Sequence, residues 1–431
     1  MIHFMRRFDL LILCFYITLA CLSGSVRAAT DAGWQQCMKR ISDQAVQQNV
    51  LPATIEYVLE RVEPLPRVIS ADRRQPEFTQ TLTDYYRQRV TQTRVEKGRA
   101  LLSEHADLLR LIQDRTGVPP HYLVALWGLE TNFGSYFGSL SIPSALATLA
   151  CDNRRSDLFT RELIAVMSII EAGDMTYDEL TGSWAGAIGH MQFMPSTFVR
   201  HAVDADHDGR INLIGSHQDA LLSGANYLIN AGWQTGYRWG REVTLPLNFD
   251  PTLMGLDQPQ ALSAWRSLGV VTTLGQPLPD EDLSASLLLP MGIDGPAFLV
   301  YPNFQVLMEW NRSQHYALSV GRLADRIAGA GRLAHPLPTI NLSTKTLKQL
   351  QTQLNALGFD VGQADGILGP ATRQAIQAFQ IRDGLIADGF PNSKLIQSVL
   401  GQATAQQTDT AQPAAEINHP DYKPQTEFQN E

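Results

Sequence analysis

A glutamate near the end of a short apolar segment is the residue of this sequence best placed to do chemistry. The spacing predicts a helix over 119–132, with prolines in its first turn and Gly134 placed to stop it. Helical geometry puts Glu130 on one face with Trp127 and other apolar side chains. Such burial favours the protonated form of a carboxyl group, which a general acid acting on a glycosidic oxygen requires. The alternative is a helix-end glutamate that reaches water or caps the backbone.

A second segment, Gly182–Ser196, alternates small and large residues around two polar side chains. Its glycines and alanines allow close approach of the backbone, and Ser183 and Gln192 flank an apolar lining. This composition suits a groove wall that binds hydroxyl or acetamido groups. The alternative is tight helix packing, which the glycines alone would satisfy.

An acidic loop over 204–212 has the spacing of a calcium site. Asp204, Asp206 and Asp208 fit positions 1, 3 and 5 of an EF-hand loop, and a glycine follows at position 6. Arg210 would contribute only its backbone carbonyl oxygen. The glutamate expected at position 12 is missing, because Gly215 stands there. A solvated acidic turn is the alternative.

Length and composition limit the class of protein. A chain of 431 residues predicts two or three domains at about 150 residues each. The hydrophobic fraction of 44% excludes a disordered chain. The formal net charge of −9, from 34 Lys and Arg against 43 Asp and Glu, argues against a nucleic-acid partner, which would require a basic stripe.

The first residues predict an export signal. Arg6 and Arg7 precede an apolar run over 10–22 that is too short to span a bilayer, and a small-residue cleavage site ends at Ala28. We therefore expect residues 1–28 to be removed and the protein to be soluble in the periplasm. The alternative makes Cys21 a lipid-modified N-terminus, and only then would the protein meet a membrane.

Hydrophobic periodicity predicts the elements that must position these motifs. Helical patterns run over 31–115, 158–171 and 217–231 and return at 304–328. The stretch 241–300 differs, with many Pro and Gly and short β-like runs, and predicts a small sheet inserted in a helical protein.

A linker rich in proline separates this body from a smaller unit. Residues 343–401 combine helical periodicity with turn glycines and predict a three-helix module. The segment 402–431 is rich in Gln, Thr, Ala and Pro and is predicted to be disordered.

Several of these motifs, in this order, resemble a known family, the lytic murein transglycosylases of the B type (glycoside hydrolase family 103). The matching stretches are Trp127–Gly134, Gly182–Ser196 and Asn311–Ala317, and the likeness runs from about 34 to 330. It implies a mainly α (α+β) fold, with a lysozyme-like helical catalytic domain over 29–335 that carries the small β insert. The 343–401 module resembles the common peptidoglycan-binding domain (type 1).

The resemblance implies a reaction on peptidoglycan glycan strands. Glu130 would protonate the β-1,4 bond between N-acetylmuramic acid and N-acetylglucosamine and then act as a base, which leaves a 1,6-anhydro end. The implied substrate-binding residues are Ser183, Gln192, Tyr227, Asn311 and Tyr316. The family usually has tyrosine where this chain has Trp310; because a hydroxyl donor is lost there, we do not assign Trp310 to the site.

The resemblance also bears on calcium and on the small module. The family has a lengthened EF-hand-like loop that ends in an aspartate, which implies Asp219 as a further ligand of a structural Ca²⁺. No cofactor is implied for catalysis. In the module, the closing turn departs from the family pattern at 388–392, which leaves the setting of the last helix open.

Other questions stay open at this point. Cys37 and Cys151 form either one disulfide or two buried thiols. A hydrolytic muramidase on the same scaffold, in which water replaces the 6-hydroxyl, and a non-catalytic wall-binding scaffold are the alternative functions. We expect a monomer.

Overall fold

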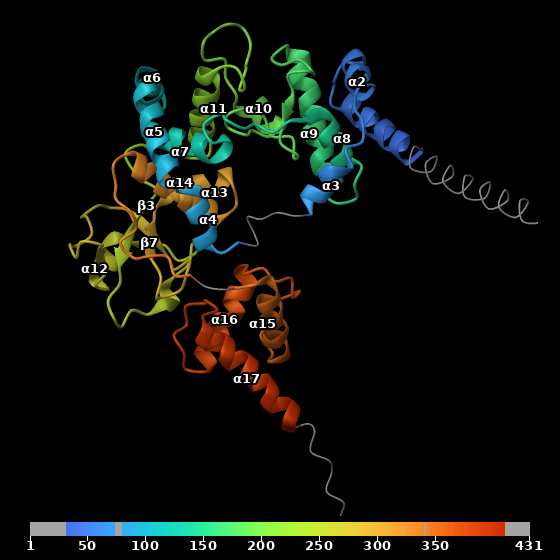
Figure 1. Ribbon diagram of the computed structural model, residues 1–431. Coiled ribbons are helices and arrows are strands. Elements are labelled where there is room, and N and C mark those ends of the chain that lie inside the picture. Colours follow the sequence, from blue (N-terminus) through green and yellow to red (C-terminus); the bar gives the residue numbers. More distant parts are fainter. Residues whose placement is uncertain (1–31, 74–79, 340–341, 410–431) are drawn as a thin grey trace, which may run out of the picture. The chain divides into compact units, whose positions relative to one another are not determined.

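The structure is a computed structural model that describes residues 32–73, 80–339 and 342–409 (Figure 1). These residues form two compact units that divide after Thr339. The predicted signal at 1–28 and the alternative lipid site at Cys21 lie outside the described residues. Each unit is described by itself below.

The first unit is mainly helical, as the periodicity predicts. A helix over 32–47 opens it. The following helices are α2 (Pro52–Leu59), α3 (Pro66–Asp72), α4 (Leu82–Arg89), α5 (Gln92–Glu104), α6 (Ala106–Thr116), α7 (Pro120–Thr131), α8 (Ile142–Ala150), α9 (Ser156–Ala172), α10 (Pro195–His201), α11 (His217–Asn230), the 3₁₀ turn η2 (Pro251–Leu253), α12 (Leu262–Ser267), α13 (Pro302–Trp310) and α14 (Gln314–Ile327).

The helix α7 lies in the interior of this unit. Its residues from Tyr122 to Leu129 are buried on every face, as expected of a helix that is apolar all round. It packs against α5, α6, α11 and α14. The helix stops earlier than predicted: Asn132 caps it in the left-handed region at φ 49°, so Gly134 is not the stop.

The segment predicted as one helix over 304–328 is two helices. The chain breaks between α13 and α14, where Asn311 is extended at φ −147° and ψ 121°. Ser313 restarts the helix by accepting a hydrogen bond from the backbone N–H of Tyr316. The capping propensity of serine was visible in the sequence, but the apolar periodicity on both sides masked the break.

The sheet insert runs from residue 240 to residue 300. Its strands are β3 (Gly240–Thr244), β4 (Gln260–Ala261), β5 (Val271–Thr272), β6 (Ser284–Leu288) and β7 (Ala297–Val300). They run antiparallel in the order β4-β6-β7-β3-β5, with Gly240 opposite Val300. Trp265 of α12 fills the core of the insert and donates its indole N–H to the carbonyl of Ala285 (2.9 Å). The insert therefore has a core of its own.

A second, two-stranded pairing connects the chain beyond α7 to the small-residue segment. The strand β1 (Leu140–Ser141) pairs antiparallel with β2 (Thr181–Gly182), with Leu140 opposite Gly182. This pairing fixes where the segment from Gly182 onward begins.

Cys37 and Cys151 form a disulfide, which decides the question the sequence left open. It joins the opening helix to the end of α8, 114 residues further along the chain. Arg40 strengthens the same junction by donating to the carbonyl of Ala150 (2.9 Å) and to the hydroxyl of Ser156 (3.1 Å).

The second unit is a three-helix module made of α15 (Thr344–Ala356), α16 (Pro370–Arg382) and α17 (Ser393–Asp409). Two buried glutamines hold its turns. Gln351 donates to Asp365 (3.0 Å) and accepts from the backbone N–H of Gly366 (2.7 Å). Gln380 repeats both contacts with Asp388 and Gly389, each at 2.8 Å. The turn that departs from the family pattern is therefore held as firmly as the first one.

The last helix is longer than the sequence predicts. The segment 402–431 was expected to be disordered, but α17 continues through Asp409. The prediction is wrong for residues 402–409, and the remainder of that segment lies outside the described residues. Alanine and glutamine are good helix formers, so a helix already begun can continue through them.

We predict that replacing Cys37 and Cys151 by serine lowers the free energy of unfolding by about 2–5 kcal/mol, because the bridge closes a long loop of the unfolded chain. Denaturant unfolding of the double variant and of the parent, with and without a reductant, measures it. Equal midpoints for the two proteins would contradict a stabilising bridge.

Candidate active site

Glu130 stands in the last turn of α7, half-buried, and one of its carboxyl oxygens receives two hydrogen bonds. The indole N–H of Trp310 donates to Oε1 at 2.8 Å. The hydroxyl of Tyr316 donates to the same atom. The two donors stand on either side of the break between α13 and α14, so the broken helix brings both to one oxygen.

Tyr316 is a neutral donor at this position. Its side chain is buried, with 4% exposed. Burial raises the pKa of its hydroxyl well above the usual value, and the adjacent Glu130 raises it further. The hydroxyl therefore keeps its proton throughout the neutral range. The sequence assigned Tyr316 to the site as a substrate contact, and the structure places it on Glu130 itself.

Trp310 is the site residue that the sequence reasoning left out. The structure contradicts that omission, because the indole N–H takes the donor role that we expected to be lost with a hydroxyl. Its ring lies in an aromatic wall, 4.9 Å from the ring of Tyr227 and 5.6 Å from that of Phe193, measured between centroids. Tyr227 is fixed in turn by a hydrogen bond from its hydroxyl to the carbonyl of Glu309 (2.9 Å). The indole N–H was the signal that could have identified Trp310.

The polar residues of the Gly182–Ser196 segment bond within their own loop. The hydroxyl of Ser183 accepts from the backbone N–H of Ala187 (3.0 Å). Gln192 has a left-handed backbone at φ 48°, and its amide donates to the carbonyl of Gly189 (3.0 Å). Since Phe193 belongs to the aromatic wall, this loop runs beside the site. Contacts of Ser183 and Gln192 with a substrate stay predictions.

Asn311 lies at the break itself, directly after Trp310 and half-buried. Its extended backbone turns the chain between the two donors of Glu130. The structure thus gathers Glu130, Tyr227, Asn311 and Tyr316 around the break.

The loop is bound to α7 by a histidine that the sequence did not single out for the site. Trp127 donates its indole N–H to Nδ1 of His190 (2.8 Å), and Thr131 donates to the carbonyl of His190 (3.1 Å). Burial lowers the pKa of His190 to about 4, so its ring is neutral and can accept that bond. Position 134, beside His190, requires glycine. Its φ of 72° is left-handed, and a Cβ there would lie 2.4 Å from Cε1 of His190.

A second buried carboxylate, Glu162 of α9, serves the frame of the site. Its two oxygens accept from the backbone N–H and from the hydroxyl of Ser196, both at 2.8 Å. This caps α10 at the end of the small-residue loop. Glu162 is therefore engaged on both oxygens.

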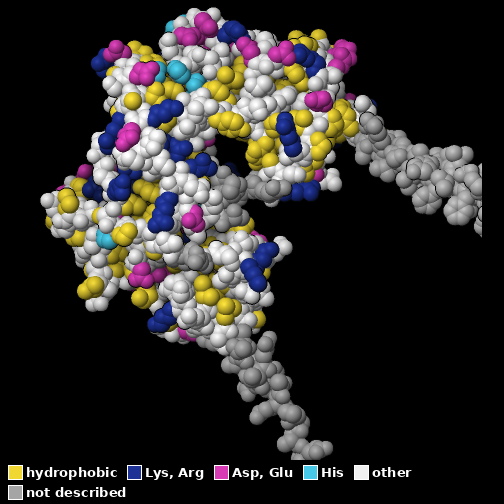
Figure 2. Space-filling model, in the orientation of Figure 1, with side chains coloured by type: hydrophobic (Ala, Val, Ile, Leu, Met, Phe, Trp, Pro, Cys, Tyr) yellow, Lys and Arg dark blue, Asp and Glu magenta, His cyan; other side chains and the backbone are white. Residues whose placement is uncertain are grey.

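The acidic loop gathers three of its predicted metal ligands. Carboxyl oxygens of Asp204, Asp206 and Asp219 lie within 4.8 Å of one another. Asp and Glu side chains gather on the surface where the loop between α10 and α11 lies (Figures 1 and 2). Burial raises the pKa of Asp219, and the charge of Asp206 adds to this. Three carboxylates this close suit a hard cation such as Ca²⁺, which takes oxygen ligands.

Two other predicted metal residues are placed differently. The carboxyl group of Asp208 is outside that group of three and accepts from the backbone N–H of Arg210 (2.8 Å). The guanidinium of Arg210 pairs with Glu179 (3.0 Å). The side chain of Arg210 thus points to another partner, and its carbonyl oxygen as a ligand stays a prediction.

Family comparisons match both units. The family described as "Transglycosylase SLT domain" matches residues 33–325, which is more than half of the chain. The family described as "Putative peptidoglycan binding domain" matches residues 343–398.

Named relatives agree with this. The chain is 33% identical over 247 residues to the membrane-bound lytic murein transglycosylase B of Escherichia coli (strain K12), covering 57% of this chain and 66% of that one. The crystal structure of SltB3 from Pseudomonas aeruginosa in complex with NAG-anhNAM-pentapeptide is similar with a TM-score of 0.81, 41% identity and coverage of 85% of this chain and 99% of that one. The Escherichia coli lytic transglycosylase Slt35 in complex with calcium is similar with a TM-score of 0.59, 30% identity and coverage of 68% and 92%.

In the part of the chain that the structure describes, we find no helix that is both long and apolar enough to cross a bilayer. The half-buried Glu130 with its two donors, the helical body with its sheet insert, and the matches over both units lead to one conclusion: this chain belongs to the transglycosylase SLT family, the lytic transglycosylases of peptidoglycan, and carries a peptidoglycan-binding domain.

Proposed function

We propose that the protein cleaves the β-1,4 bond between N-acetylmuramic acid and N-acetylglucosamine in glycan strands, with Glu130 as the only acid and base. The observation that carries this proposal is the pair of donors on Oε1 of Glu130, from Trp310 and Tyr316. They hold one carboxyl group in a fixed orientation beside an aromatic wall, as a proton-transfer group requires.

The reaction needs two proton transfers through one carboxyl group. The protonated carboxyl of Glu130 gives its proton to the glycosidic oxygen as the bond to the anomeric carbon breaks. The carboxylate then takes the proton of the muramoyl 6-hydroxyl, whose oxygen closes onto the anomeric carbon. The product carries a 1,6-anhydro ring, no water is consumed, and Glu130 ends protonated as it began.

Four further residues are proposed to bind the sugar around this step. Tyr227 and Asn311 stand at the aromatic wall and at the helix break. Ser183 and Gln192 belong to the loop that runs beside the wall. Tyr316, the fifth residue that the sequence assigned to substrate, is proposed to act through Glu130.

A hydrolytic muramidase is the alternative on this scaffold. A hydrolase with two carboxylates needs them about 5–9.5 Å apart, so that the second can attack or activate water. Glu162 is the buried carboxylate beside the second motif, and both its oxygens are used in holding Ser196. This favours the lytic reaction.

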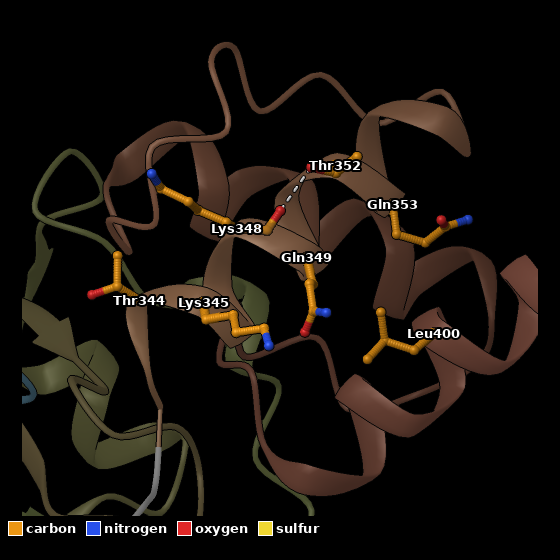
Figure 3. Close-up of a pocket in the computed structure, with 7 residues that line it drawn as sticks. All are labelled: Thr344, Lys345, Lys348, Gln349, Thr352, Gln353 and Leu400. Atoms are coloured by element: carbon orange, nitrogen blue, oxygen red, sulfur yellow. Dashed lines mark hydrogen bonds between the residues drawn. The ribbon is translucent and has the colours of Figure 1, made fainter.

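We propose that the second unit holds the enzyme on the wall through a face of α15. A surface hollow of about 640 Å³ on this unit is lined by Lys345 and Lys348 together with Thr344, Gln349, Thr352, Gln353 and Leu400 (Figure 3). In the described part of the chain, neither lysine forms an ion pair. Two unpaired cations among hydroxyl and amide groups suit the carboxylates and amides of peptidoglycan stem peptides.

Calcium is proposed as a structural ion of the loop. Asp204, Asp206 and Asp219 would hold it, and its charge would relieve the repulsion among the three carboxylates. A calcium complex is known for Slt35, which is 30% identical. We assign the ion no part in the reaction.

The proposed site of action is the periplasm, in keeping with the export signal predicted at 1–28. Lipidation of Cys21 would add a membrane anchor. We expect a monomer and no nucleic-acid partner, in keeping with the net charge of −9.

We predict that Glu130→Gln lowers turnover of soluble muropeptides by at least about 10³-fold, because both proton transfers are lost. Binding to purified sacculi, measured by co-sedimentation, should stay nearly unchanged. Glu104→Gln, an exposed position at the end of α5, is the matched control and should keep the parent rate. Mass spectrometry of the parent's products should give ends one water lighter than those of a hydrolase; ends at the hydrated mass would establish the muramidase instead.

For the binding unit, we expect the double variant Lys345→Glu/Lys348→Glu to bind sacculi about two- to twentyfold more weakly at low salt, and the difference to shrink as salt screens the charges. Cleavage of soluble fragments should not change. Lys394→Glu on α17 reverses one charge outside the hollow, and this variant should bind sacculi as the parent does. Retention of the double variant equal to that of the parent would remove the hollow from the binding site.

For the metal, added Ca²⁺ at about 100 times its dissociation constant should stabilise the protein by about 2.7 kcal/mol, seen as a higher Tm that a chelator reverses. Asp219→Asn should abolish the response. If melting curves with calcium and with chelator superimpose for the parent, the loop binds no calcium.

A further inference from the structure

The two donors on Oε1 of Glu130 are chemically different. The Tyr316 hydroxyl has lone pairs as well as a proton and can both donate and accept. The indole nitrogen of Trp310 only donates. At 2.8 Å from this N–H, Oε1 must therefore be the acceptor whichever way the hydroxyl turns.

This restricts where Glu130 can carry its own proton. A carboxyl oxygen has two lone-pair directions in the plane of the group. On Oε1 the indole N–H takes one and the hydroxyl of Tyr316 takes the other. While the Tyr316 hydroxyl donates, as it does in this structure, Oε1 accepts in both directions and the proton of the acid form stands on Oε2.

From this we infer that Trp310 is a positioning residue that reserves Oε1 as an acceptor, so that both proton transfers of the reaction pass through Oε2. The inference rests on the proposed function, in which Glu130 is the acid and then the base. No proton has to change oxygen between the two steps, because the oxygen that releases one proton to the glycosidic oxygen also receives a second one from the 6-hydroxyl.

The wall around Trp310 is built to keep the indole in this orientation. The ring of Tyr227 contacts it nearly edge-on, with an interplanar angle of 72°, and the ring of Phe193 contacts it at 59°. The extended backbone of Asn311 then ends α13 directly after it. The indole is thus held from the loop, from α11 and from its own helix end.

The inference has a consequence for pH that an inert wall would not have. A donor to a carboxyl oxygen stabilises the charged form, so its removal lets Glu130 keep its proton to higher pH. The first step needs that proton, and activity falls on the alkaline side when it is lost. Without the indole N–H, the alkaline limb of the pH profile of kcat should shift to higher pH. The value of kcat should fall at the same time, since the proton can then occupy either oxygen.

The test uses the full chain with three replacements at one position. Trp310→Phe removes the N–H and part of the ring. β-(3-Benzothienyl)alanine at position 310 keeps the bicyclic shape and replaces only the N–H by sulfur. Trp310→Tyr returns a hydroxyl donor. Each is assayed for kcat and KM on soluble muropeptides across pH, with Tm measured alongside.

We expect both variants without a donor to lose about tenfold or more in kcat with KM nearly constant, and the alkaline limb to rise by about one pH unit. Trp310→Tyr should recover kcat and return the limb toward that of the parent. The inference is overturned if the benzothienyl variant keeps the parent's kcat and the parent's alkaline limb. It is also overturned if kcat falls while the alkaline limb stays at the same pH and Trp310→Tyr does not restore kcat. The benzothienyl variant decides the matter even if Trp310→Phe fails to fold.

Glu130→Gln, assayed in the same series, separates this inference from the proposed function. An active Glu130→Gln protein would overturn the assignment of Glu130 itself. An inactive one, together with Trp310 variants that behave like the parent, would overturn only the role of Trp310.

Discussion

The hydrogen bonds to Oε1 of Glu130 are the constraint on which the arrangement of the first unit depends. A half-buried carboxyl group loses part of its water and needs donors in exchange. Here they come from Trp310 and Tyr316, 180 and 186 residues along the chain. Because one unbroken helix could not aim both at one atom, the break between α13 and α14 is part of the site. The apolar packing around α7 complements this break. The helix is buried on all sides, and its last turn brings the polar side chain of Glu130 toward the aromatic wall.

The rest of the site is a frame that keeps this geometry from drifting. Trp127 and Thr131 bind the small-residue loop to α7 through His190, and Glu162 binds the far end of that loop to α9. Each contact satisfies a polar group that would be costly to bury alone. The loop itself has left-handed residues, such as Gln192 at φ 48°, that no regular element supplies. Such a loop needs anchors at both ends, and it has them.

The need of polar groups for partners also applies to the smaller unit and to the acidic loop, but the two meet it differently. In the module, the amides of Gln351 and Gln380 bind their turns through hydrogen bonds within the protein. In the loop, three carboxylates converge, and each of their oxygens accepts a hydrogen bond from a backbone N–H or a hydroxyl. Within the described residues, none of the three forms an ion pair with a cationic side chain. The charge that remains is the reason to expect a cation there and not in the module.

What the sequence by itself determined is local. Three patterns depend only on neighbours a few residues away: the periodicity that predicts α7, α9 and α11, the β-like runs of the insert, and the spacing of Asp204 and Asp206. A family motif around Glu130 singled out the catalytic candidate. Tertiary structure alone decided the partners: the indole N–H of Trp310 on Glu130, the bridge from Cys37 to Cys151, and the exclusion of Asp208 from the carboxylate group. Side-chain chemistry is written in the sequence, but the distance between two groups far apart in the chain is set only when the core packs.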